Sequence, residues 1–159
     1  MDSRFDGEIT AYGLAHRDYP IFDGGGAFKH GSRWCSPGRS IVHAASAYAL
    51  AVLENVVHWR LAYLPPGMRY VQIKIPAAVS RRALDPAELP GWDSYPYGVS
   101  QQFGDGWYDR RESAVLLVPS VLSPFEPNVL INQRHPELEV ISASDPAPAV
   151  IDPRLISHR

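Results

Sequence analysis

The clearest periodic pattern along the chain is apolar and lies between two turn-forming segments. From Ala47 to Leu64 there is no glycine or proline, and apolar residues recur three or four positions apart, at Leu50, Leu53, Val57, Leu61 and Leu64. This spacing is typical of the buried face of an α-helix. Ser46 is a suitable N-cap, and Pro65-Pro66-Gly67 stops the pattern. The sequence therefore predicts one helix over Ala47–Leu64.

Shorter apolar or alternating stretches predict strands. In YVQIKI, Tyr70–Ile75, strict alternation places Val71, Ile73 and Ile75 on one face. The other candidate strands are Ser40–His43, Ala114–Val118, Val129–Ile131 and Val140–Ser142. We therefore expect a fold dominated by a sheet.

A long region without clear periodicity separates the predicted strands Tyr70–Ile75 and Ala114–Val118. It runs from Pro76 to Asp109 and contains one short helix candidate around Asp85–Leu89. A loop of this length inside a compact domain is usually a functional lid or binding loop, or a sign of an unrecognised element. With 15 prolines and 12 glycines in the chain, short elements joined by defined turns are expected.

The composition indicates one globular domain over residues 1–159. The chain is 45% hydrophobic and 20% charged, which is enough apolar material for a core. Its formal net charge is -2, and no block of like charge is longer than a pair. A binding surface for duplex nucleic acid is therefore not expected, whereas a local anion site is compatible with this charge.

The sequence favours a cytoplasmic protein. Cys35 is the only cysteine, so no disulfide can form within the chain. The N-terminus, MDSRFDGEIT, lacks the basic start and apolar run of a signal peptide. The longest uncharged stretch, Ser40–Leu53, is too short to span a bilayer.

Glu54 is the first candidate for chemistry. It follows Leu50 by four residues and precedes Val57 by three, so a helix places it on or beside the apolar stripe. A carboxylate there needs a partner or a cleft, and it is either an active-site acid or a residue at the solvent edge of the stripe. His58, one turn later, is more often structural than catalytic in such a position.

Several other chemistries find little support. The spacing of the histidines matches no zinc site, and there is no HExxH motif. The histidines are at positions 16, 30, 43, 58, 135 and 158. Cys35 with His43 as base is a weak nucleophile signal, and Ser120 lacks a GxSxG elbow. Gly24-Gly25-Gly26 matches no phosphate-binding motif and is expected to be a turn.

The loop GSRWCSPGR, Gly31–Arg39, carries a second candidate site. Arg33 offers a planar fork of donors that suits a phosphate or carboxylate, and Trp34 offers a surface for stacking or packing. The alternative is an arginine paired with an acidic residue beside a core tryptophan. The residues alone indicate no more than a nucleotide site.

The order of several blocks resembles the RES-domain family, the toxins of RES-Xre toxin-antitoxin modules. The blocks span residues 24–155 and read SRWCSPGRSIVH, ALAVLENVVHW, RYVQIKIP, LPGWDSYP, FGDGW, SAVLLVPSVLSPFEPNVLINQRHPE and DPRL. The family is named for an arginine, a glutamate and a serine far apart in sequence. Arg33, Glu54 and Ser120 match them, whereas the contiguous Arg111-Glu112-Ser113 does not.

The resemblance implies an α+β single domain of the ADP-ribosyltransferase-like type, with a central sheet and flanking helices. It also implies that NAD is a substrate, cleaved between nicotinamide and ribose, with no prosthetic group and no metal. Arg33 would hold the pyrophosphate or orient the ribose, and Glu54 would stabilise the charge that develops on the ribose. Ser120 would hydrogen-bond the nicotinamide amide or the ribose. The NAD-binding set implied by the resemblance also contains Trp34, His43 and Asn132.

Two positions depart from the family pattern. Relatives commonly have a tyrosine where this chain has His43, and an N-terminal Trp-Arg or Tyr-Arg pair where it reads Ala11-Tyr12-Gly13-Leu14. Arg33 is then expected to carry more of the NAD binding, unless Arg17 or Arg39 substitutes.

Three functions are compatible with this resemblance. The first is an NAD-degrading toxin, a glycohydrolase or phosphorylase, that an Xre-type antitoxin holds in check. The second is transfer of ADP-ribose to a protein, and the third is a catalytically weakened domain that serves as an interaction module. No nucleic acid or membrane partner is expected.

Overall fold

The fold is built on one mixed β-sheet. The computed structural model describes residues 3–59 and 64–156, and within these ranges eight strands form the order β4-β5-β6-β2-β1-β3-β7, with β8 also paired to β3. Neighbouring strands are antiparallel except for the parallel pair β4 and β5. The strands are β1 (Ile9–His16), β2 (Ile41–Ala45), β3 (Met68–Ile75), β4 (Arg81–Ala83), β5 (Val115–Val118), β6 (Asn128–Asn132), β7 (Ser142–Ala143) and β8 (Ala147–Pro148).

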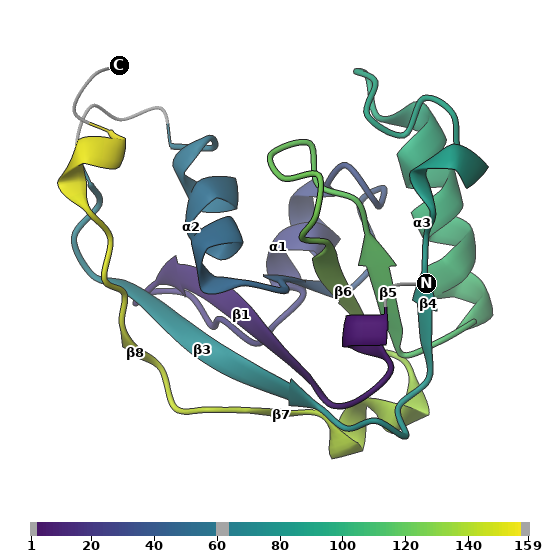
Figure 1. The fold of residues 1–159 in the computed structure, drawn as a ribbon, viewed down its shortest axis with the longest axis horizontal. Helices are drawn as coiled ribbons and strands as arrows, with labels where there is room; N and C mark the ends of the chain where they lie inside the picture. The colour runs from purple at the N-terminus through teal and green to yellow at the C-terminus, as the bar shows by residue number, and fades with distance from the viewer. Residues whose placement is uncertain (1–2, 60–63, 157–159) are drawn as a thin grey trace.

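Three α-helices lie on the same side of this sheet (Figure 1). They are α1 (Gly25–His30), α2 (Tyr48–Val56) and α3 (Gly98–Arg110). Short 3₁₀ turns occur at Ser3–Phe5, Pro86–Glu88, Pro136–Val140 and Pro153–Leu155. The predicted α+β class is confirmed.

Alternation along the central strands separates two cores. On the helix side, Ile41, Leu116 and Leu130 pack with Ala27 of α1 and Trp107 of α3. The residues of opposite parity on the same strands form the core of the other face, which includes Val42, Val115 and Ile131. Since successive side chains of a strand point to opposite faces, every second residue of β2 and β6 faces the helices.

Most predicted elements are confirmed, with one misplaced strand and one shortened helix. Val140 belongs to a 3₁₀ turn, and the strand that follows is Ser142–Ala143. The helix predicted over Ala47–Leu64 ends at Val56, and residues 60–63 lie outside the described residues. Within α2 the buried residues are Leu50, Ala51, Val52 and Val56, whereas Leu53 and Val57 are exposed. The predicted apolar stripe was therefore partly wrong.

The sequence pattern missed five of the α-helices and strands, namely β1, α1, α3, β4 and β8. The strand β1 has a weak alternation, and α1 begins where three glycines predicted a turn. Helix α3 lies in the supposedly irregular region Pro76–Asp109, together with β4 and the 3₁₀ turn that confirms the short helix candidate. No helix in the described ranges is both long and apolar enough to cross a membrane.

Candidate functional site

A large pocket opens between α2 on one side and the α1–β2 segment on the other. Its volume is about 1090 Å³, and its floor is formed by residues of β1, β2 and β6 that face the helices. Among them are Tyr12 and Leu14 of β1, His43 of β2 and Leu130 of β6. A cavity of this size and mixed polarity is large enough for a ligand of dinucleotide size.

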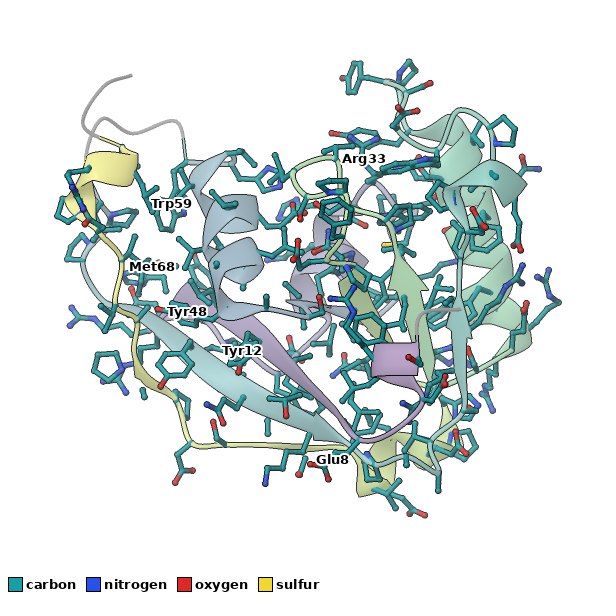
Figure 2. All side chains as sticks on the ribbon, in the orientation of Figure 1. Glu8, Tyr12, Arg33, Tyr48, Trp59 and Met68 are labelled. Atoms are coloured by element: carbon teal, nitrogen blue, oxygen red, sulfur yellow. The ribbon has the colours of Figure 1, made fainter. Side chains whose placement is uncertain are left out.

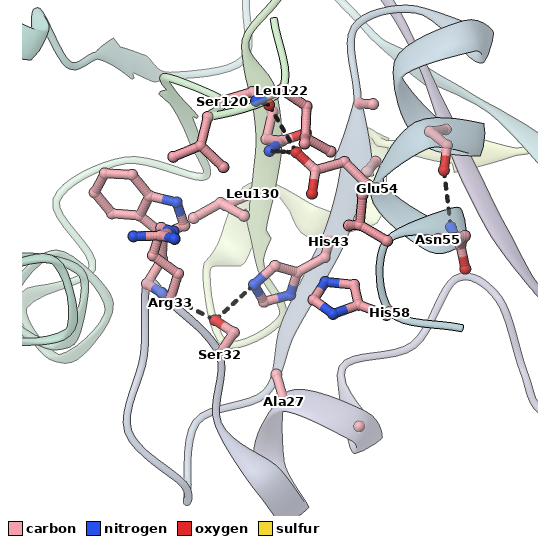
Figure 3. A pocket seen from close by; sticks show the side chains of 18 of the residues that line it. Ala27, Ser32, Arg33, His43, Glu54, Asn55, His58, Ser120, Leu122 and Leu130 are labelled. Carbon is pink, nitrogen blue, oxygen red and sulfur yellow. Dashed lines mark hydrogen bonds between the residues drawn. The ribbon is translucent and has the colours of Figure 1, made fainter. Parts of the chain in front are cut away.

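Glu54 enters the pocket from α2. Leu50 and Ala51, one turn earlier, are buried against the sheet, so Glu54 lies half-buried beside them rather than on the solvated face. Its Oε1 accepts hydrogen bonds from Ser120 Oγ at 2.8 Å and from Asn128 Nδ2 at 2.6 Å. Figure 3 shows this carboxylate facing the pocket with Ser120 above it. The structure thus brings Glu54 and Ser120, 66 residues apart, into direct contact.

Arg33 lies on the opposite wall, as Figure 3 also shows. Its Nη1 donates to the backbone oxygens of Trp92 at 3.2 Å and Ser94 at 3.3 Å, and its guanidinium lies 4.5 Å from the centre of the Tyr97 ring. The arginine is paired with carbonyls and an aromatic ring rather than with an acidic residue. A guanidinium of this kind keeps its charge and can offer its remaining donors to an anion.

Helix α3 fixes the loop that carries Arg33. Ser100 Oγ donates to Arg33 O at 2.7 Å, and Gln101 Nε2 donates to Ser32 O at 2.8 Å. Gly104 makes the approach possible, because a Cβ on it would lie 1.8 Å from Trp34 O. The loop and α3 therefore pack backbone against backbone.

Trp34 lines the pocket but is almost entirely buried. Its ring stacks on Trp92 with 6.1 Å between ring centroids, and it packs in the core beside α3. This placement combines both interpretations of the sequence, since the tryptophan is a core residue whose edge borders the pocket.

His43 lies on the floor of the pocket and is tied to the Arg33 loop. Its Nδ1 donates to Ile41 O at 3.2 Å, because a carbonyl can only accept, so Nε2 is left to accept from Ser32 Oγ at 2.9 Å. The side chain is exposed to the cavity, yet protein atoms around the ring desolvate its charged form. This desolvation lowers the pKa of His43 below its ordinary value, against the opposing effects of Ile41 O and the Glu54 charge.

The cysteine beside this network is not arranged as a nucleophile. Cys35 is fully buried, and burial raises the pKa of its thiol. Ser32 Oγ lies between it and the histidine, 3.4 Å from Cys35 Sγ. His43 therefore bonds the serine hydroxyl rather than the thiol.

Asn132 does not reach the pocket. It is fully buried at the end of β6, where its Nδ2 donates to Tyr108 O and its Oδ1 accepts from Arg134 N. Asn128, at the start of the same strand, is the asparagine that lines the pocket and bonds Glu54. The sequence contained Asn128 in the block PNVLIN, but nothing in the pattern separated the two asparagines.

The structure also limits which arginine can replace the absent N-terminal one. Arg39 is held by Asp105 at 3.3 Å and Asp109 at 2.6 Å, and neither Arg17 nor Arg39 is among the described residues that line the pocket. Gly13 lies on the other face of β1, where its Cβ position is 3.1 Å from Ile21 Cγ2. Among the described residues that line the pocket, Arg33 is the only arginine.

The contiguous Arg111, Glu112 and Ser113 are not among the described residues that line the pocket. Arg111 caps α3 in the left-handed conformation, and Glu112 pairs with Arg82 and Arg110. The Ser113 hydroxyl is buried, where it accepts from Trp107 Nε1.

The chain and its fold are similar to those of several known proteins. The family model described as RES domain matches residues 10–152. A "Prs ADP-ribosylating toxin" from Sphingobium sp. (strain YBL2) is 44% identical over 137 residues, 84% of this chain and 85% of the relative. A "Toxin Res" from Yersinia enterocolitica is 34% identical over 152 residues, 92% of this chain and 99% of the relative. The fold is also similar to that of the toxin in the M. tuberculosis MbcT-MbcA toxin-antitoxin complex, with a TM-score of 0.68 and 14% identity over 89% of this chain and 86% of that one.

Proposed function

Because this chain belongs to the RES-domain family, we propose that it is the toxin of a toxin-antitoxin pair and cleaves the bond between nicotinamide and ribose in NAD. Two relatives that span most of the chain carry the name of a toxin, and the similar solved fold comes from a toxin-antitoxin complex. The proposed partner is accordingly an antitoxin protein. We propose that it is of the Xre type, as the resemblance of the sequence blocks implies.

The observation that carries the proposal is the half-buried carboxylate of Glu54, fixed by two donors and facing a large pocket. When nicotinamide leaves, positive charge develops on the ribose C1′ and ring oxygen. A preorganised carboxylate in a partly dehydrated pocket stabilises that charge more than water does, because it needs no reorganisation. Glu54 would therefore lower the barrier by electrostatics, without itself moving a proton.

The opposite wall is suited to the anionic half of NAD. Arg33 is held by carbonyl oxygens through Nη1, which leaves its other donors for the pyrophosphate. Binding of this remote, unreactive part would position the ribose against Glu54, which is how enzymes use binding energy for orientation. The aromatic rings of Tyr12 and Tyr97, together with His43, would flank the planar groups of the substrate.

The acceptor of ADP-ribose defines the reaction class. Water would make the protein a glycohydrolase, and phosphate would make it a phosphorylase. Transfer to a protein is a second candidate, and the Sphingobium relative supports it, since its name describes an ADP-ribosylating toxin.

The test is incubation of the purified protein, free of antitoxin, with NAD in the presence and absence of phosphate, followed by mass spectrometry. We expect nicotinamide to be released by the wild type and not by Glu54→Gln, which keeps the shape of the side chain but removes its charge. The accompanying product, ADP-ribose or its phosphorylated form, identifies the acceptor. Release that requires an added protein, which then gains the mass of ADP-ribose, would identify a transferase. If nicotinamide is released under none of these conditions, the proposal is wrong.

A further inference from the structure

The two oxygens of the Glu54 carboxylate have different surroundings. Oε1 receives both hydrogen bonds, from Ser120 and Asn128, and no described residue donates to Oε2. In Figure 3 the free oxygen points toward the interior of the pocket, while the bonded one faces the strand and loop behind it. The carboxylate is therefore oriented as well as placed.

Both donors are themselves fixed. The Ser120 hydroxyl accepts from Leu122 N at 3.0 Å, so its own proton is directed to Glu54. Asn128 begins β6, pairs in register with Ala45 of β2, and shares the helix-facing side with Leu130. A donor on a strand inside a sheet holds its position better than one on a loop.

The bond to Glu54 is a role for Ser120 in addition to the contact with the substrate that the resemblance implies. The serine lines the pocket, and its hydroxyl donates to the glutamate. Asn128 lies closer still to the same oxygen, at 2.6 Å, so both donors meet on Oε1.

We infer that Asn128 is a positioning residue which, together with Ser120, binds Oε1 of Glu54 so that Oε2 alone is presented to the ribose of the substrate. The inference rests on the proposed function for the identity of the substrate. The orientation of the Glu54 carboxylate by Asn128 does not depend on which substrate binds.

A side-chain NMR measurement tests the orientation without any substrate. In a ¹H–¹⁵N spectrum of the wild-type protein, one amide proton of Asn128, assigned by its absence from Asn128→Asp, should be shifted downfield by the carboxylate. In Glu54→Gln this shift should be largely lost, because a neutral acceptor replaces a charged one. An Asn128 signal that is the same in both proteins would overturn the inference.

Kinetics test the consequence for the reaction. Asn128→Ala should lower kcat about 10- to 100-fold, as expected for a lost bond to a charged group, and leave KM within about threefold. Asn128→Asp keeps the shape of the side chain but places a second carboxylate against that of Glu54 at neutral pH, where the two repel each other. As the pH falls, the introduced carboxyl becomes protonated and can donate to Oε1, so its kcat relative to the wild type should rise. Asn128→Ala should show no such recovery.

The matched control is Gln102→Glu, which makes the same change of charge on an exposed position of α3. It should behave as the wild type. If Asn128→Asp and Asn128→Ala lose activity equally at every pH, or raise KM as much as they lower kcat, Asn128 is a structural residue and the inference is wrong. If the wild type releases no nicotinamide, the proposed function fails, while the NMR result still decides whether Asn128 orients Glu54.

Discussion

At the scale of single residues, the pocket separates its charges onto two walls. Glu54 on α2 has its hydrogen bonds on one oxygen, and Arg33 on the facing loop has its carbonyl partners on one nitrogen. Both residues line the cavity, and each has polar atoms that no described residue bonds. This division matches a substrate with a cationic reacting end and an anionic remainder.

Replacing Arg33 tests whether this residue binds the pyrophosphate of NAD. Arg33→Ala should weaken NAD binding about 10- to 100-fold, because it removes charge-assisted hydrogen bonds worth about 1.5–3 kcal/mol. Arg33→Lys should recover part of the affinity, since it keeps the charge and loses the fork. Calorimetry in a Glu54→Gln background measures binding without turnover. Arg17→Ala, at an exposed position that does not line the pocket, is the control. Equal affinity in Arg33→Ala and Arg17→Ala would remove Arg33 from the phosphate role.

His43 predicts a pH dependence of stability. Its pKa in the folded protein is lowered, so the unfolded chain binds a proton on this residue at a higher pH than the folded one does. The free energy of unfolding should therefore fall as the pH decreases from about 6.5, the ordinary histidine value, through the folded pKa. His43→Gln should reduce this loss. Thermal unfolding of both proteins between pH 7.5 and 5 measures it, and curves of equal slope would show that His43 has no part in it.

At the scale of elements, the sequence predicted the strands with regular alternation but did not predict helix α3. Strands such as Tyr70–Ile75 have a clear alternation because one face is buried. Helix α3 contains Gly98, Gly104 and Gly106. Because glycine has a low helix propensity, the sequence of this segment did not predict a helix. Gly104 is needed for its contact with the Arg33 loop, a tertiary requirement that no local pattern reveals.

Two glycines of α3 provide a matched pair of substitutions. Gly104→Ala should destabilise the protein by about 1–3 kcal/mol, because its Cβ meets the backbone oxygen of Trp34. It should also weaken NAD binding, since the loop bearing Arg33 must move. Gly106→Ala should be neutral or stabilising by up to about 1 kcal/mol, because its Cβ meets only the flexible end of Arg110. Chemical unfolding compares the two, and an equal effect would contradict the close contact at Gly104.

At the scale of the whole molecule, the sheet assembles a site from segments far apart in the chain. Register between β2 and β6 places His43 beside Leu130 and Ala45 beside Asn128, and α2 packs against β1 and β2. Figure 2 shows Tyr48 at the start of α2 and Arg33 across from this helix. The order of sequence blocks was sufficient to select Arg33, Glu54 and Ser120 as candidates. The sharing of Glu54 between Ser120 and Asn128 depends on register and side-chain direction, so it required the structure.

The most direct test of the whole account is a crystal structure of Glu54→Gln with NAD bound. We expect the nicotinamide ribose beside residue 54 and the pyrophosphate against Arg33, with the reacting bond intact. NAD bound in the reverse direction, or outside the pocket between α2 and the Arg33 loop, would contradict it.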